Sequence, residues 1–132
     1  MTHKFSLRVY YEDTDLAGIV YYANYLKFIE RARSTIVHEA GIDQMDMQSD
    51  GLVFAVKKLE ADYIGSAKLN DELRVETNLK QVTGAKIVFA QNVYRADALL
   101  FSSFVTVVCV TNLGKITRFP AKIRAKLTDM SN

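Results

Sequence analysis

Three carboxylates, an Ala-Gly break and three tyrosines follow one another between residues 12 and 25, where a strongly helical pattern begins. In chain order they are Glu12, Asp13, Asp15, Ala17, Gly18, Tyr21, Tyr22 and Tyr25. A carboxylate beside the start of a helix can act as a nucleophile or as a general base. The unpaired N–H groups of the first helical turn can meanwhile stabilise a developing negative charge. The segment therefore combines the two kinds of group that nucleophilic or acid–base chemistry needs.

The rest of the chain has the size and composition of one folded domain. Its 132 residues are 49% apolar, which is enough for a core that needs no disulfide or metal. The net charge of +2, from 17 basic and 15 acidic residues, is too balanced to favour nucleic acid as a partner. No apolar run approaches the ~18 residues of a membrane span, and no signal peptide is apparent. The single Cys109 fits a reducing compartment. We therefore expect one cytoplasmic domain over residues 1–132.

The hydrophobic pattern predicts one strand, one long helix and then four more strands. Residues 5–11 alternate between apolar and polar side chains, which is typical of a strand. Apolar residues recur every three or four positions over residues 23–40, and Gly41 suits the end of that helix. Residues 42–51 read as a polar loop. Further strands are expected at residues 52–64, 72–82, 85–95 and 98–111, and a short helix at 121–127 after Pro120.

This order of elements predicts an α+β fold. Consecutive strands with short turns form hairpins, and one face of the resulting antiparallel sheet can cover the helix. The run Phe104–Val110 is apolar on both of its faces. Cover on both sides is therefore expected, which indicates an interface between subunits.

The run Y-x-x-D-T-D-x-x-G-x-V-Y-Y-x-N-Y and the order of elements resemble the hotdog-fold acyl-CoA thioesterases of the 4-hydroxybenzoyl-CoA thioesterase type. Within that group the chain is most similar to the Tol-Pal-associated acyl-CoA thioesterases. The match covers Arg8–Tyr25 and continues through residues 30–33. The resemblance implies a five-stranded antiparallel sheet wrapped around one long central helix. It also implies homodimers joined edge to edge, often paired into homotetramers, with active sites at the subunit interface.

The resemblance also assigns roles to individual residues. It implies that Asp15 is the catalytic aspartate and that a backbone N–H near Tyr22 polarises the thioester carbonyl. Many Tol-Pal-associated members carry His where this chain has Tyr22, and the exchange leaves the backbone role intact. Lys86 falls where related enzymes carry basic residues near the phosphates of CoA. Gly18, interpreted from its residue type alone, provides a turn or a close approach of substrate to the backbone.

Several of these residues also have a purely structural interpretation. Asp15 could cap N–H groups of a turn, although the surrounding motif favours catalysis. Tyr25 could pack the start of the helix or line an acyl pocket, and its type fits both. Asp13 and Glu12 are interpreted as a hydrogen bonder in a turn and a surface charge. Asn24 is interpreted as a helix cap.

Other kinds of catalytic centre find no support in the sequence. His3, at the chain terminus, and His38 have neither metal-ligand spacing nor a partner Cys, and Cys109 lies inside an apolar run. The sequence lacks G-x-S-x-G and G-x-G-x-x-G, so no serine triad and no nucleotide cofactor is expected. The helix charges Glu30, Arg31 and Arg33 are predicted to form ion pairs or a solvated face. We expect no metal or cofactor.

The sequence therefore predicts an enzyme that hydrolyses an acyl-CoA thioester to a carboxylic acid and CoA. Asp15 would act as general base on water or as the nucleophile that forms an acyl-enzyme. The alternative is a non-catalytic module that binds acyl-CoA or acyl carrier protein. A dehydratase of the same fold ranks last, because it needs a His paired with a carboxylate, and His3 and His38 lack that context.

Overall fold

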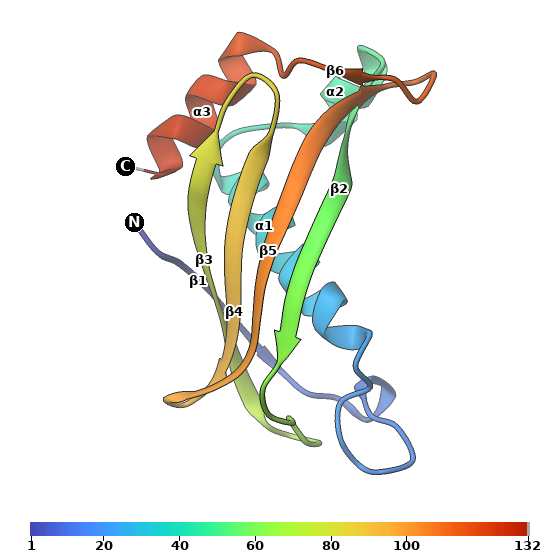
Figure 1. The fold of residues 1–132 in the computed structure, drawn as a ribbon, viewed down its shortest axis with the longest axis vertical. Coiled ribbons are helices and arrows are strands. Elements are labelled where there is room, and N and C mark those ends of the chain that lie inside the picture. The colour runs from blue at the N-terminus through green and yellow to red at the C-terminus, as the bar shows by residue number, and fades with distance from the viewer. Residues whose placement is uncertain (132) are drawn as a thin grey trace.

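An antiparallel sheet of six strands covers one long helix in the computed structural model, which describes residues 1–131 (Figure 1). The five long strands are ordered β1-β3-β4-β5-β2, and β6 pairs with β5. In chain order the elements are β1 (His3–Arg8), the 3-10 helix η1 (Tyr11–Asp13), α1 (Asn24–Glu39), α2 (Gln44–Ser49), β2 (Leu52–Tyr63), β3 (Glu72–Val82), β4 (Ile87–Arg95), β5 (Ala98–Thr111), β6 (Ile116–Thr117) and α3 (Ala121–Ser131). The predicted α+β arrangement is confirmed, with one strand more than expected.

The core forms where the apolar stripe of α1 meets the inner face of the sheet. Phe28, Ile29 and Ala32 of α1 are almost completely buried, as are Val75 of β3 and Phe101 of β5. Burying one large apolar side chain contributes roughly 1.5–3 kcal/mol. The alternation of apolar and polar residues in the strands thus determines which face of the sheet receives the helix.

A polar network crosses this core and connects α1 to β4. Gln91 is fully buried, and its Nε2 donates to the carbonyl oxygen of Ile29 and to Oγ1 of Thr77, both over 3.0 Å. Oε1 of Gln91 accepts a hydrogen bond from Nη1 of Arg33 over 3.0 Å. Burial lowers the pKa of Arg33, and nearby Glu30 acts in the opposite direction. The prediction of an ion pair or solvated charge is therefore wrong for Arg33, whose guanidinium is half-buried against Gln91.

Two short elements differ from the prediction. Residues 42–51, expected as a loop, contain α2, because the side chain of Asp43 caps it by accepting the N–H groups of Met45 and Asp46. Met47 of α2 is buried and holds the helix against the rest of the fold. β6 was not expected, because two residues are too few to show a period, and it pairs with β5 through Cys109 and Val110.

The N-terminal strand also differs at both of its ends. It ends at Arg8 rather than at residue 11, because residues 11–13 turn into η1. His3, although close to the chain terminus, is the first residue of β1. It pairs with Thr77 of β3, and its Nε2 lies 3.2 Å from Oε1 of Glu39.

β2 is an edge strand of the sheet. It pairs with β5 along one side, and no described strand pairs with its other side. Val56 and Leu59, near its middle, are 52% and 39% exposed, and Phe104 on the neighbouring strand is 47% exposed. A long edge with exposed apolar side chains is a surface on which another chain can pair. None of the helices in residues 1–131 has the length and apolar character needed to span a membrane.

Candidate active site

The segment between β1 and α1 folds into a tight hairpin that carries Asp15 at its bend. Thr14 bridges to Val20, and the N–H of Asp15 donates to the carbonyl of Ile19 over 2.9 Å. The N–H of Gly18 closes the turn by donating to the carbonyl of Asp15 over 3.0 Å. Gly18 has φ of +80°, a left-handed conformation that costs other residues about 1–2 kcal/mol. The turn, one of the two predicted roles of Gly18, is confirmed.

One carboxylate oxygen of Asp15 is fixed and the other is unoccupied. Oδ1 accepts the N–H of Ala17 over 2.9 Å. Within residues 1–131, Oδ2 has no hydrogen-bond partner, and the side chain is exposed. Because one oxygen orients the group and the other remains available to a water or a carbonyl carbon, the capping and catalytic interpretations are compatible.

Helix α1 begins beside this hairpin without a side-chain cap. Ala23 occupies the N-cap position, and the first turn holds no acidic residue. Within the part of the chain that the structure describes, the N–H groups of Tyr22 and Ala23 have no acceptor. No carboxylate or side-chain cap of these residues therefore offsets the positive end of the helix dipole, and these two amides can bind an oxyanion. Asn24, predicted as a cap, is instead the first helical residue.

Hydrogen bonds to Asp13 attach the hairpin to the start of the helix. The buried side chain of Asn24 donates to the carbonyl oxygen of Asp13 over 2.9 Å, and the N–H of Tyr21 donates to the same oxygen. The carboxylate of Asp13 accepts the N–H of Tyr10 over 2.9 Å. The predicted hydrogen-bonding role of Asp13 is confirmed. These bonds hold Asp15 in a fixed relation to the first amides of α1.

The three tyrosines of the motif have different surroundings. Tyr25 is 2% exposed, its ring stacks on Phe101 at 5.2 Å between centroids, and its hydroxyl accepts the N–H of Ala67. Burial raises the pKa of Tyr25, so its hydroxyl stays neutral. Tyr21 and Tyr22 are exposed. Tyr25 thus packs the start of the helix, and a contact with substrate stays a prediction.

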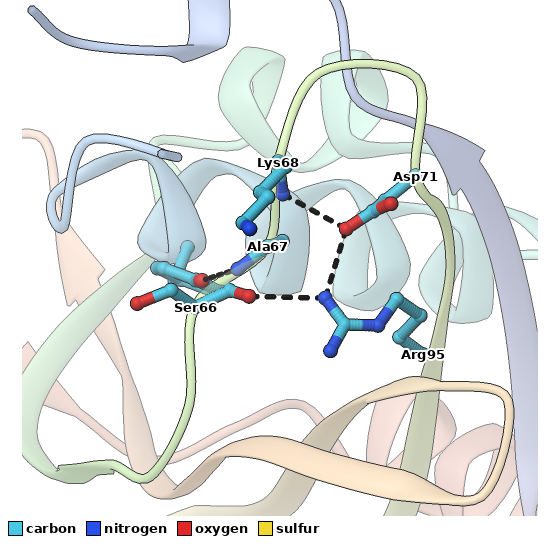
Figure 2. Close-up of polar contacts among 6 residues, drawn as sticks. Ser66, Ala67, Lys68, Asp71 and Arg95 are labelled. Atoms are coloured by element: carbon cyan, nitrogen blue, oxygen red, sulfur yellow. Dashed lines mark hydrogen bonds and ion pairs between the residues drawn. The ribbon is translucent and has the colours of Figure 1, made fainter. Parts of the chain in front are cut away.

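The loop between β2 and β3 supports the hairpin from the side. Ile19 bridges to Lys68, and the N–H of Val20 donates to the carbonyl of Ala67 over 2.8 Å. Figure 2 shows how this loop is braced: Nη1 of Arg95 contacts the carbonyl of Ser66 at 3.0 Å and Oδ2 of Asp71 at 2.9 Å. The position of Asp15 therefore depends on residues far from it in the sequence.

The contact between Arg95 and Asp71, called the brace below, makes the stability of the fold depend on pH. Burial acts to raise the pKa of Asp71, but the N–H of Lys68 and the guanidinium of Arg95 outweigh it, so this pKa lies below its usual 3.8. Because the folded pKa is the lower one, the stabilisation is fully present above the unfolded pKa and is lost as pH falls through the folded pKa.

Asp71→Asn should therefore lower Tm at pH 7, and its Tm should fall less steeply than that of the wild type below about pH 4. Calorimetry from pH 7 to pH 2 measures both effects. Asp97→Asn, at an exposed aspartate in the turn between β4 and β5, is the matched control and should follow the wild-type curve. A wild-type acid slope in Asp71→Asn would show that this carboxylate is not linked to folding.

Lys86 is far from Asp15, because the turn between β3 and β4 and the loop between η1 and α1 lie at opposite ends of the sheet (Figure 1). It follows the turn between β3 and β4, whereas the hairpin adjoins residues 67–68 near the other end of β4. The 9 residues of β4 span about 30 Å at ~3.3 Å each. Arg118 lies over the same turn, because a Cβ on Gly84 would collide with its guanidinium. Lys86 and Asp15 of the same chain are therefore too far apart to belong to one site.

A cavity of about 260 Å³ opens between α1 and the first half of β2. Apolar side chains from several elements line it, among them Val37, Phe54, Ile87, Phe89, Val107 and Leu127. Glu30, Arg33, Ser34 and Gln44 add polar groups. Its size is just below the roughly 300–1,000 Å³ typical of ligand pockets. Asp15 is not among the residues that line it.

Comparison with known proteins identifies the family. Residues 9–127 match the profile of the Thioesterase-like superfamily. The chain belongs to this superfamily. The acyl-CoA thioesterase YbgC of Haemophilus influenzae is 44% identical over 124 residues, which cover 92% of this chain and 90% of that protein. The acyl-CoA thioester hydrolase YbgC of Escherichia coli O6:H1 is 37% identical over 111 residues, 83% of each chain.

Solved structures confirm the fold of this superfamily member. The crystal structure of a probable thioesterase from Bartonella henselae is 30% identical, with a TM-score of 0.85 and coverage of 91% of this chain and 100% of that one. The predicted hotdog fold and the predicted thioesterase family are therefore both confirmed.

Sequence reasoning missed one residue at the site of this thioesterase-like protein. Tyr63, the last residue of β2, donates its hydroxyl to the carbonyl oxygen of Tyr22 over 3.0 Å. No spacing in the sequence relates these two positions, because 41 residues separate them and tertiary packing brings them together. The same is true of the pair Arg95 and Asp71.

Proposed function

We propose that this protein hydrolyses acyl-CoA thioesters to a carboxylic acid and CoA, with Asp15 as the acting carboxylate and the N–H of Tyr22 as oxyanion donor. The observation that carries the proposal is the unoccupied oxygen of Asp15 on a hairpin that is hydrogen-bonded to an uncapped helix start. Two relatives, 44% and 37% identical, are named acyl-CoA thioesterase and acyl-CoA thioester hydrolase, which supports the substrate class.

The chemistry needs only these two groups and a water molecule. As the thioester carbon is attacked, its oxygen becomes an oxyanion, and the helix amide stabilises that charge by an amount typically worth ~3–4 kcal/mol per donor. Asp15 either removes a proton from the attacking water or attacks directly to form an acyl-enzyme that water then cleaves. The CoA thiolate leaves readily, because a thiol pKa near ~8.5 makes it a weak base.

A second subunit completes the site in this proposal. Ligand pockets bury about 70–90% of a bound small molecule, whereas Asp15 and Tyr22 are exposed in the single chain. Two copies that pair antiparallel along β2 would place the first half of one β2 beside Tyr63 of the other. The cavity between α1 and β2 of one subunit then opens near Asp15 of the other and can receive the acyl group.

The same two-fold pairing would reverse the ends of the two chains. Lys86 of the partner subunit would then lie at the end of the molecule that carries Asp15, where it could bind the phosphates of CoA. Arg118, which lies over the same turn, adds a second cation. A dimer, or a tetramer built from two such dimers, is thus part of the proposal. A cytoplasmic location is also part of it and is supported by the single Cys109.

Purified protein should release free thiol from acyl-CoA without an added metal or cofactor. Because the cavity of about 260 Å³ is just below the roughly 300–1,000 Å³ of typical ligand pockets, kcat/KM should be higher for short or single-ring acyl groups than for long-chain ones. A screen of short, long and aromatic acyl-CoAs with a thiol reagent measures this. Burial raises the pKa of Cys109, so the enzyme itself adds little signal.

Matched acyl groups on acyl carrier protein show which thiol carrier is preferred. Tight binding of acyl-CoA with no thiol release at any acyl length would replace the enzymatic proposal with the non-catalytic binding module.

A further inference from the structure

The carbonyl oxygen of Tyr22 receives its hydrogen bond from outside α1. Tyr22 precedes the N-cap residue Ala23, so its carbonyl oxygen lies outside the hydrogen-bond ladder of the helix. Here the N–H of Leu26 donates to the carbonyl of Ala23 over 3.2 Å. The hydroxyl of Tyr63 donates to the Tyr22 oxygen instead, over 3.0 Å. The peptide unit that leads into the helix is therefore held by a side chain from the end of β2.

The ring of Tyr63 is held in place by its aromatic neighbours. Its centroid lies 5.0 Å from that of Phe101, 5.7 Å from that of Tyr25 and 6.0 Å from that of Tyr22. Edge-to-face contacts at these separations are favourable and directional. The hydroxyl therefore reaches Tyr22 from a fixed ring rather than from a freely rotating side chain.

The backbone that follows Tyr63 is equally constrained. The N–H groups of Ile64 and Gly65 both donate to the carbonyl of Leu100, over 2.8 and 3.0 Å. Gly65 approaches β5 so closely that an added Cβ would lie 2.9 Å from the Leu100 side chain. β2 thus ends at a defined point against β5, and Tyr63 is placed by the sheet rather than by a flexible loop.

The hydroxyl of Tyr63 also keeps its proton. Although Tyr63 is 47% exposed, partial desolvation raises its pKa, and the neighbouring hydroxyls of Tyr22 and Tyr25 act in the same direction. Tyr63 is therefore a hydrogen-bond donor throughout the neutral pH range. The acceptor it meets belongs to the peptide unit that joins Tyr22 to Ala23.

We propose that Tyr63 is a positioning residue for thioester hydrolysis, which fixes the peptide unit between Tyr22 and Ala23 so that the N–H of Ala23 joins that of Tyr22 as oxyanion donor. A peptide unit is a rigid plane, so a bond to its carbonyl oxygen also sets the direction of its N–H. The same bond polarises the unit and strengthens that N–H as a donor. The inference rests on the proposed function, because it assigns a support to the same oxyanion site.

Tyr63→Phe tests the role with the removal of one hydroxyl from a ring that keeps its contacts. We expect kcat to fall about tenfold, less than the 10²–10³ that follows the loss of a direct donor, while KM changes less than twofold. The second readout is infrared spectroscopy of a ¹³C-labelled ketone analogue of acyl-CoA, in which CH₂ replaces the thioester sulfur. Its carbonyl stretch should move to higher frequency in the variant, because a polarising donor is weakened. A merely structural role would leave this frequency unchanged.

Tyr25→Phe is the matched control, because it removes a hydroxyl from the same aromatic cluster that bonds Ala67 instead. It should lower Tm without moving the carbonyl stretch. If Tyr63→Phe does not fold, difluorotyrosine at position 63 replaces it. Its phenol ionises at lower pH, and kcat should fall as the donor is lost.

Asp15→Asn in the same series separates the two proposals. Full activity in Asp15→Asn would overturn the proposed function. An inactive Asp15→Asn beside a Tyr63→Phe with wild-type kcat and an unshifted carbonyl stretch would overturn the role of Tyr63 alone.

Discussion

Replacing Asp15 with Asn should lower kcat for acyl-CoA hydrolysis at least about a hundredfold, because general acid–base catalysis contributes ~10²–10⁴ in rate. The amide oxygen of Asn can still accept the N–H of Ala17, which Asp15 accepts over 2.9 Å, so the hairpin should keep its shape. The amide can neither deprotonate water nor attack the thioester. Thiol release measures the loss, and calorimetry should show a Tm close to that of the wild type.

Glu12→Gln is the matched control, because Glu12 is an exposed carboxylate three residues earlier in the same segment. It should keep wild-type turnover. Wild-type turnover in Asp15→Asn would instead show that the acting carboxylate lies elsewhere.

Turnover in ¹⁸O-labelled water can identify Asp15 as a nucleophile. Hydrolysis of an acyl-enzyme at the aspartyl carbonyl transfers solvent oxygen into the Asp15 side chain, where mass spectrometry of a peptide detects it. A general base leaves the side chain unlabelled, as does an acyl-enzyme that water cleaves at the acyl carbonyl, because the solvent oxygen then goes only to the released acid.

Local periodicity explains why most of the fold could be predicted from the sequence. The helix expected at residues 23–40 is observed at Asn24–Glu39, and β5 has its predicted bounds, Ala98–Thr111. Both are long enough for their period to stand out from the background. α2 and β6 have six and two residues, so a single cap and tertiary pairing decide them.

In the candidate site, too, residues close together in the sequence could be predicted, and residues brought together by tertiary contacts could not. Asp15, Gly18 and the amide of Tyr22 lie within eight residues, so a motif can record them. Tyr63 and the brace between Arg95 and Asp71 reach the site through tertiary contacts over tens of residues, which no single sequence displays. Part of the site could therefore be predicted as a list of reactive groups, while the residues that hold those groups in place required the structure.

Asp15 is exposed in the single chain, so the site needs cover from a second chain. The free edge of β2 is the surface on which that chain can pair. β2 has 12 residues, and its last residue, Tyr63, contacts Tyr22 directly. An edge of this length with unpaired N–H and C=O groups favours pairing with another strand. Self-pairing about a two-fold axis is antiparallel, so it would bring the cavity of one subunit to the hairpin of the other.

Leu59→Glu should convert the protein to a folded monomer and lower activity at least about a hundredfold, because each site would lose the wall that the partner supplies. The two-fold axis places the new carboxylates of both subunits close together, where like charges repel. The side chain of Leu59 is 39% exposed in the single chain and does not line the cavity, so Tm should fall only by the contribution of the interface. Analytical ultracentrifugation and thiol release measure the two effects on the same sample.

Phe104→Lys, on the outer face of the sheet and also exposed, is the control. It can break contacts between dimers, yet it should leave an active dimer. A monomeric Leu59→Glu variant with full turnover would refute the shared site and return the whole reaction to one chain.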